Sequence, residues 1–175
     1  MALISGGGNG IGSSEPVTWA DLGCGDGTFT RALAHLLAPG SVVHAVDLDD
    51  TALAGIAGEE DGVSIVTHRA DFVREAWPFA RIDGILMANS LHYVRDQEAF
   101  IRRCDTHLKA DGRFIIVEYD HDRPNRWVPY PVSRQRLTAL FTAAGYAPPV
   151  LLGSRPSVYQ RGEMYAALIQ RTATA

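Results

Sequence analysis

The chain has 175 residues, of which 46% are hydrophobic and 21% charged, and its net charge is −4. This composition predicts one compact domain and disfavours a nucleic-acid-binding protein, which needs a basic surface. The longest apolar runs, such as 114–117, are far below the roughly 18 residues of a membrane span, so no membrane segment is expected. The chain begins without the basic and apolar stretches of a signal peptide, and its two cysteines, Cys24 and Cys104, have no metal-site spacing. We therefore expect a cytoplasmic protein without a metal centre, whose oligomeric state the sequence leaves open.

Strand patterns alternate with helix patterns along the chain. The apolar runs that predict parallel strands are 17–22, 41–46, 63–67, 82–87 and 113–118. The stretches with helical spacing are 29–37, 51–57, 97–108 and 133–144, the last capped by Ser133 and closed by Gly145. Two further strands, 149–152 and 164–170, end the chain as a hairpin-like pair. This alternation predicts a doubly wound α/β fold, with a mostly parallel seven-stranded sheet, helices on both faces and an antiparallel C-terminal strand.

A glycine-rich loop follows the first predicted strand. In doubly wound sheets, ligands bind beyond the carboxyl ends of the strands, which is where Gly23, Gly25 and Gly27 lie. Glycines there let the backbone turn tightly and bring its N–H groups close to a ligand. Asp47 ends the second strand, 20 residues after Gly27, where a carboxylate can accept hydrogen bonds from both ribose hydroxyls. Together the loop and the acid predict a site for a nucleoside-containing ligand.

Two cofactors fit such a site, and the spacing distinguishes them. A dinucleotide loop requires a third glycine where this chain has Thr28, so the NAD pattern is not met. Asp21, two residues before the first glycine, suits a ligand with a cationic amino group, such as S-adenosylmethionine. The other acids of this region, Asp26, Asp49 and Asp50, are expected to cap the helices that follow them.

Five motifs, in order, resemble those of class I S-adenosylmethionine-dependent methyltransferases. They are 21–27, 44–47, 69–72, 82–93 and 107–113. The resemblance runs from about residue 17 to 170, although the family's usual N-terminal helices are missing, and Ala110 and Asp111 replace the usual Pro and Gly of the last motif. It implies that S-adenosylmethionine is the cofactor, with Asp47 on the ribose and Asp71 on the adenine. The cofactor-binding residues that it implies are Asp21, Gly23, Cys24, Gly25, Gly27, Asp47, Leu48, Ala70, Asp71, Phe72, Asn89 and Ser90.

The implied reaction is in-line transfer of the methyl group to a small-molecule acceptor. His92 and Glu118, after the fourth and fifth parallel strands, are the candidate catalytic residues, because a phenol or alcohol acceptor needs a general base. His92 has the alternative of packing against the adenosine or capping its loop. Tyr93, Trp127 and Tyr130 are expected to wall the acceptor, with core packing as the alternative for Trp127 and Tyr130. A non-catalytic cofactor-binding subunit and, with less support, an RNA methyltransferase are the competing functions.

A glycine-rich segment, 1–16, precedes the single methyltransferase-like domain, 17–175. Within it, residues 3–12 resemble the cofactor loop of short-chain dehydrogenases, but too few residues precede them to form a buried strand. The catalytic Tyr-x-x-x-Lys of those enzymes is also absent, since Asp105 stands four residues before the only lysine, Lys109. We expect the segment to be a flap that closes over the cofactor, with Trp127 or Tyr130 closing from the other side.

Overall fold

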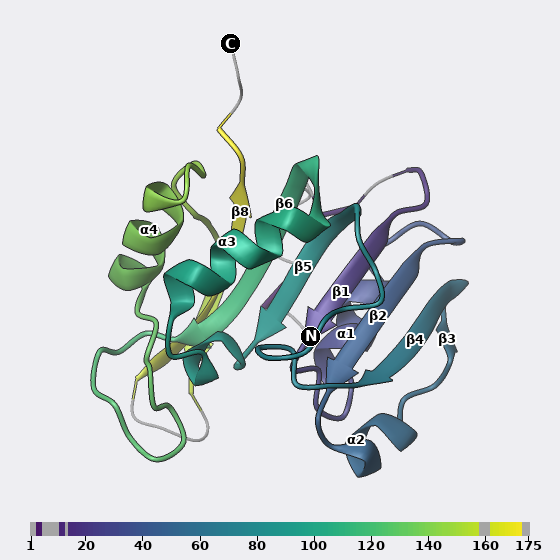
Figure 1. Ribbon diagram of the computed structural model, residues 1–175, viewed down its shortest axis with the longest axis horizontal. Helices are drawn as coiled ribbons and strands as arrows, with labels where there is room; N and C mark the ends of the chain where they lie inside the picture. The colour runs from purple at the N-terminus through teal and green to yellow at the C-terminus, as the bar shows by residue number, and fades with distance from the viewer. Residues whose placement is uncertain (1–2, 5–10, 13, 158–161, 173–175) are drawn as a thin grey trace.

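The computed structural model describes residues 3–4, 11–12, 14–157 and 162–172. In these ranges, one mixed sheet forms the centre of the molecule (Figure 1). Its strands are β1 (Thr18–Leu22), β2 (Val42–Asp47), β3 (Glu59–Glu60), β4 (Val63–Arg69), β5 (Ile82–Ala88), β6 (Leu108–Tyr119), β7 (Val150–Pro156) and β8 (Glu163–Gln170). Their order across the sheet is β3-β4-β2-β1-β5-β6-β8-β7. The strand order reverses between β1 and β5, which is where a doubly wound sheet binds ligands.

Helices cover both faces of this sheet. They are α1 (Thr28–Ala34), α2 (Asp50–Ala54), α3 (Gln97–His107) and α4 (Arg134–Ala143), with a short 3-10 helix, η1 (Leu91–Tyr93). The helices α3 and α4 lie on one face, where Phe100 and Phe141 join its core, and α1 lies on the other, where Leu33 is buried (Figure 1). The predicted α/β fold is therefore confirmed. Within the described ranges, none of the helices has the length and apolar character needed to span a bilayer.

The strand directions agree with the prediction, with two differences. The strands β4, β2, β1, β5 and β6 are parallel, β8 is antiparallel to β6, and β7 is antiparallel to β8. The first difference is β3, a two-residue edge strand that pairs with the start of β4 and had no sequence signal. The second is that β6 begins at Leu108 rather than at Arg113. Leu108 pairs with Ile82, and a register shift before Gly84 accommodates the expected turn inside the strand.

Trp19 of β1 sets a packing requirement at the centre of the sheet. Its ring is buried, and a Cβ atom built on Gly84 of the neighbouring β5 would lie 2.5 Å from ring atoms of Trp19. The indole therefore occupies the volume of the missing side chain. Because core positions tolerate little extra volume, only glycine fits at residue 84.

No helix follows β4, although the structure describes all of residues 70–81 between β4 and β5. Three aromatic side chains from this segment, Phe72, Trp77 and Phe79, cover the sheet instead. The ring of His44 on β2 stacks on Phe79 with centroids 4.5 Å apart, and its Nδ1 lies 3.0 Å from Nε2 of His68 on β4. Burial lowers the pKa of both histidines, which favours the neutral form of the two imidazoles.

Three apolar residues of the glycine-rich N-terminal segment pack into the core. Leu3, Ile4 and Ile11 are buried in the cluster on the α1 face of the sheet. Residues 5–10 and 13, which make up most of the expected flap, lie outside the described residues. Closure of the flap over a cofactor therefore stays a prediction.

Candidate functional site

A cavity of about 630 Å³ opens beyond the carboxyl ends of the parallel strands. Its walls come from the loops that follow β1, β2, β4, β5 and β6. The lining residues are Gly23, Asp47, Leu48, Asp71, Phe72, Val73, Arg74, Asn89, Ser90, Tyr93, Arg95 and Tyr130. Most of the predicted cofactor residues that follow β2, β4 and β5 are thus brought together here.

The glycine loop after β1 needs its glycines for conformation and for space. Gly23, Gly25 and Gly27 have φ values of +77°, +54° and +76°, a region that residues with a Cβ atom rarely adopt. A Cβ atom on Gly23 would lie 2.6 Å from Cβ of Ser90, and one on Gly27 would lie 2.9 Å from Ile56. At Gly25 a Cβ atom would meet open space. The loop is therefore packed tightly at both ends and open in the middle. Gly23 lines the cavity, whereas the other two predicted cofactor glycines, Gly25 and Gly27, do not.

Asp47, at the end of β2, holds the neighbouring loops in place. Its Oδ2 accepts a hydrogen bond from the backbone N–H of Gly25 at 2.8 Å, and its Oδ1 accepts one from Asp49 at 3.0 Å. The carbonyl of Val46 accepts two further bonds, from the N–H groups of Gly23 and Cys24. The end of β2 and the glycine loop are thus one hydrogen-bonded unit.

Two buried oxygens near the carboxyl ends of β1 and β5 have no hydrogen-bond partner in the described part of the chain, one on Asp21, which does not itself line the cavity, and one on Asn89, which does. Asp21 is fully buried beneath the glycine loop, and its Oδ2 accepts a hydrogen bond from Thr30 at 2.7 Å, while its Oδ1 is unpartnered. Desolvation raises the pKa of this carboxyl group to about 7, against the opposing effect of the Thr30 bond. The second oxygen is Oδ1 of Asn89, a cavity residue with φ of +56°. Unpartnered buried acceptors are rare, and both of these are suited to a ligand with N–H donors.

Asp71 organises the loop after β4. Its Oδ1 accepts hydrogen bonds from the backbone N–H groups of Val73 and Arg74 at 2.9 and 3.2 Å, and its Oδ2 lies 3.5 Å from the Arg74 guanidinium. The next residue, Phe72, packs edge-on against Phe100 of α3 and faces the cavity. Ala70, a predicted cofactor residue, donates its N–H to the carbonyl of Asp47 and does not line the cavity.

His92 and Glu118, the predicted catalytic residues, form a buried pair that does not line the cavity. Their side chains are 2% and 0% exposed. Oε2 of Glu118 lies 2.7 Å from Nδ1 of His92, and Oε1 accepts a hydrogen bond from the His92 backbone N–H at 3.0 Å. The pair therefore lies outside the cavity lining and fixes the η1 turn. This arrangement resembles the alternative expected for His92, in which the histidine caps its own loop.

The predicted acceptor residues separate into two groups. Tyr93 and Tyr130 line the cavity. Tyr130 is held by two hydrogen bonds, from its N–H to the carbonyl of His92 at 3.0 Å and from the Gln97 side-chain amide to its own carbonyl at 2.9 Å. Trp127 is 68% exposed, under the guanidinium of Arg126, and neither lines the cavity nor joins the core.

Cys24 packs away from the cavity. Its side chain is buried in a small apolar cluster with Ala45, Leu53, Ile56 and Ile65. Burial raises the pKa of its thiol, which keeps the group protonated. Cys24, a predicted cofactor residue, therefore fills space beneath the loop and does not line the cavity; its Sγ lies 3.7 Å from the carbonyl oxygen of Gly25.

Three lining residues were missed by the sequence analysis. Val73 and Arg74 directly follow the predicted Asp71 and Phe72, and Arg95 follows Tyr93 by two residues. The signal that could have found them is proximity to the end of a parallel strand, because every loop at that edge contributes to the same cavity.

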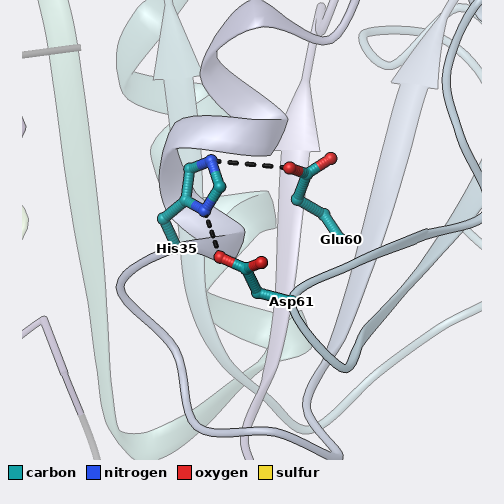
Figure 2. A group of neighbouring side chains, drawn as sticks. All are labelled: His35, Glu60 and Asp61. Atoms are coloured by element: carbon teal, nitrogen blue, oxygen red, sulfur yellow. Dashed lines mark hydrogen bonds and ion pairs between the residues drawn. The ribbon is translucent and has the colours of Figure 1, made fainter.

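A second polar cluster lies on the side of the molecule, and Figure 2 shows its three side chains. Nε2 of His35, at the end of α1, lies 3.5 Å from Oε1 of Glu60, and Nδ1 contacts the carboxylate of Asp61. These residues are close enough to hold a metal ion. However, the two ring nitrogens face different carboxylates, so the contacts already satisfy the imidazole and fasten α1 to the turn between β3 and β4.

Comparisons with known proteins agree with this architecture. The sequence is 29% identical over 97 residues to ubiquinone biosynthesis O-methyltransferase of Bradyrhizobium diazoefficiens, a match that covers 55% of this chain and only 37% of that protein. The fold matches, with a TM-score of 0.66, that of 1,6-didemethyltoxoflavin-N1-methyltransferase from Burkholderia thailandensis, at 22% identity over 91% of this chain and 73% of that one. It also matches magnesium protoporphyrin IX methyltransferase from Synechocystis PCC 6803, with a TM-score of 0.62 and 12% identity over 90% of this chain and 71% of that one.

The family itself follows from the sequence. A family model described as a methyltransferase domain matches residues 20–114, more than half of the chain. The matched region runs from β1 into β6 and contains the glycine loop, Asp47 and Asp71. The dehydrogenase-like residues 3–12 lie before it. This chain belongs to the methyltransferase domain family.

Proposed function

We propose that this protein binds S-adenosylmethionine in the cavity and transfers its methyl group to a small molecule. The observation that carries the proposal is the pair of unpartnered buried oxygens, Oδ1 of Asp21 and Oδ1 of Asn89, beside the glycine loop. A cationic amino group has three N–H donors and no acceptor, so it complements these two oxygens. S-adenosylmethionine carries such a group at one end and an adenosine at the other.

The remaining cofactor contacts follow from the order of the strands. Asp47 ends β2, which lies between β4 and β1 in the sheet, and its carboxylate would accept hydrogen bonds from the ribose hydroxyls. Phe72 and Leu48 would lie against the adenine, and Asp71 would orient the loop around it. When bound, the cofactor supplies a methyl group that the acceptor takes by in-line displacement.

The chain's own residues contribute alignment and exclusion of water. The His92–Glu118 pair, predicted as catalytic, is better suited by its burial to a positioning role. Glu118 fixes η1 by accepting the N–H of His92, and the His92 carbonyl in turn accepts the N–H of Tyr130. These bonds hold the backbone of Tyr93 and Tyr130, which line the cavity. Correct alignment of two bound reactants is by itself a large source of rate.

A small acceptor is supported by the cavity and by the relatives. The cavity of about 630 Å³ has the size of a small-molecule site and must hold both the cofactor and the acceptor. The relatives named above include proteins of ubiquinone biosynthesis and of 1,6-didemethyltoxoflavin methylation. Their acceptors are small molecules, which favours this class over RNA.

The test has two stages. Isothermal titration calorimetry with S-adenosylhomocysteine should give a saturable heat, and its absence at high protein concentration would remove the cofactor from the proposal. Transfer from radiolabelled S-adenosylmethionine is then measured with a panel of phenols, amines and nitrogen heterocycles. Binding without transfer to any member would favour the non-catalytic alternative.

A further inference from the structure

Arg95 differs from the other arginine that lines the cavity. The guanidinium of Arg74 lies 3.5 Å from the carboxylate of Asp71. Arg95 lines the same cavity, is exposed, and makes no ion pair or hydrogen bond with any residue that the structure describes. The guanidinium of Arg95 is therefore a cation at the cavity that has no partner among the described residues.

The backbone that carries Arg95 is firmly held. The preceding Val94 is buried at 1% exposure, and the side chain of the following Asp96 caps α3 by accepting the N–H of Ala99 at 3.0 Å. Three residues before Arg95, both the N–H and Nδ1 of His92 contact Glu118. A long charged side chain thus extends from a rigid base, which limits the loss of entropy when a ligand binds it.

The order of the strands assigns Arg95 to the acceptor half of the cavity. Across the carboxyl edge, the strands run β4, β2, β1, β5 and β6. The residues suited to the cofactor, Asp71, Asp47 and Gly23, follow the first three. Asn89 and Ser90, which come directly after β5, belong with these cofactor residues. The lining residues farther along the loop after β5 and in the loop after β6 are two tyrosines, Tyr93 and Tyr130, and the arginine. Tyr93 is 54% exposed, so its ring is available to a ligand.

We propose that the acceptor is a planar, ring-containing small molecule that carries an oxyanion, and that Arg95 binds this oxyanion. A guanidinium matches the geometry of a carboxylate or phosphate with two parallel N–H donors. The rings of Tyr93 and Tyr130 supply flat apolar surface for the planar part of the acceptor. The inference rests on the proposed function, because it needs the cofactor to occupy the other half of the cavity.

The test compares an anionic probe with a neutral probe of the same shape and adds a second anion of different chemistry. The protein loaded with S-adenosylhomocysteine is titrated with 3,4-dihydroxybenzoate, with its neutral amide, and with phenyl phosphate. We expect an anionic probe to bind roughly tenfold more tightly than the amide, the size of effect that one charge-assisted contact gives. The benzoate and phosphate arms distinguish the two kinds of oxyanion.

Variants attribute the preference to one side chain. Arg95→Ala should lose the preference for the anion while keeping its affinity for S-adenosylhomocysteine, and Arg95→Lys should keep part of it. Arg102→Ala removes an exposed arginine of α3 that does not line the cavity, so it should behave as wild type. Equal binding of all three probes, no binding of either anionic probe, or a preference that survives in Arg95→Ala would show the inference to be wrong. The titrations are repeated without S-adenosylhomocysteine, so that failure to bind this ligand, which counts against the proposed function, is seen separately.

Discussion

Asp47 accepts a hydrogen bond from the backbone N–H of Gly25 at 2.8 Å, so the acid at the end of β2 fixes the loop at the end of β1. The same carboxylate lines the cavity, where the ribose of the proposed cofactor would lie. One side chain therefore supports the shape of the loop and also offers acceptors to the ligand. Loss of this side chain should affect both.

Replacing Asp47 by alanine should weaken the binding of S-adenosylhomocysteine by about 1–3 kcal/mol, because charge-assisted hydrogen bonds are lost. The measurement is calorimetric titration of the purified variant. Asp26→Ala is the matched control, since Asp26 is an exposed acid of the neighbouring glycine loop whose side chain accepts hydrogen bonds from Thr28 and does not line the cavity. An Asp47→Ala protein with wild-type affinity would remove this residue from the site.

Replacing Gly23 by alanine should lower the free energy of unfolding and prevent cofactor binding. The left-handed backbone alone costs about 1–2 kcal/mol for a residue with a Cβ atom, and the contact of 2.6 Å with Ser90 adds to it. Gly145→Ala separates the two effects, because its φ is +85° but nothing lies within 4 Å of the added atom. Urea unfolding should show a clearly larger loss of unfolding free energy for Gly23→Ala than for Gly145→Ala. Equal losses would mean that backbone strain alone, without the contact with Ser90, accounts for the destabilisation.

Asp21 should make the stability of the protein depend on pH. Its pKa is raised from 3.8 to about 7 in the folded state, so between these values the folded state binds more protons than the unfolded state. The contribution of Asp21 to stability then falls as pH rises from about 4 to 7, and the penalty is complete above pH 7. Asp21→Asn keeps an acceptor for Thr30 and removes the penalty, so it should be the more stable protein at pH 8, by up to about 4 kcal/mol.

Chemical unfolding of both proteins across this pH range measures the effect. The difference between them isolates Asp21 from other titrating groups, such as His44 and His68. A constant difference from pH 4 to pH 8 would contradict a raised pKa at Asp21.

Binding of the cofactor product should release a proton through the same residue. The cationic amino group of S-adenosylhomocysteine, placed beside Asp21, favours the carboxylate and lowers its pKa. Near pH 6 the carboxyl group is protonated before binding, so ionisation releases up to one proton, whereas near pH 8 it is already ionised. Calorimetry in buffers of different ionisation enthalpy counts the protons. The Asp21→Asn protein should show no such release, and an equal release from it would point to another group.

Replacing Glu118 by alanine should mainly destabilise the fold. The change leaves the N–H and Nδ1 of buried His92 without their acceptor, and removal of one partner of a buried pair costs about 3–5 kcal/mol. Glu118→Gln restores a neutral acceptor and should recover part of the stability and most of the cofactor affinity. A stable Glu118→Gln protein that binds S-adenosylhomocysteine normally but has lost all methyl transfer would instead support the catalytic role expected from the sequence.

The fold could be predicted from the sequence because its signals are local. Each strand and helix has its own periodicity, and two of the expected caps are present, with Asp49 accepting from Thr51 and Ser133 accepting from Arg136. The cap residue of α1 is Gly27 rather than the expected Asp26, whose side chain accepts a hydrogen bond from the Thr28 N–H, and Asp50 is the first residue of α2 rather than its cap. Gly145 ends α4 with a positive φ, as expected of a C-terminal glycine. The two-residue β3 and the early start of β6 had no such signal, because both depend on pairing with a distant strand.

The site residues could be predicted where a loop motif defines their positions, and less well where the packing of side chains determines whether a residue reaches the cavity. Asp47 and Gly23 occupy the expected cavity because their positions follow from the strand ends. The burial of Glu118 depends on the path of η1, which folds His92 over it, and no periodicity in the sequence reports such a contact. Trp127 was expected at the acceptor because aromatic residues favour pockets, but its loop holds it in solvent.

The position of β8 has a consequence for the order of assembly. This strand follows all the other described strands in the sequence, yet it lies between β6 and β7 and pairs with both. During synthesis, β7 therefore has no partner in the sheet until residues 163–170 have left the ribosome. Its apolar residues Val150 and Leu151 stay exposed even in the folded protein, so the nascent chain presents an unpaired apolar strand for that interval. Closure of the sheet on this side must be a late event, and nascent chains that stop short of β8 should be the ones that chaperones retain.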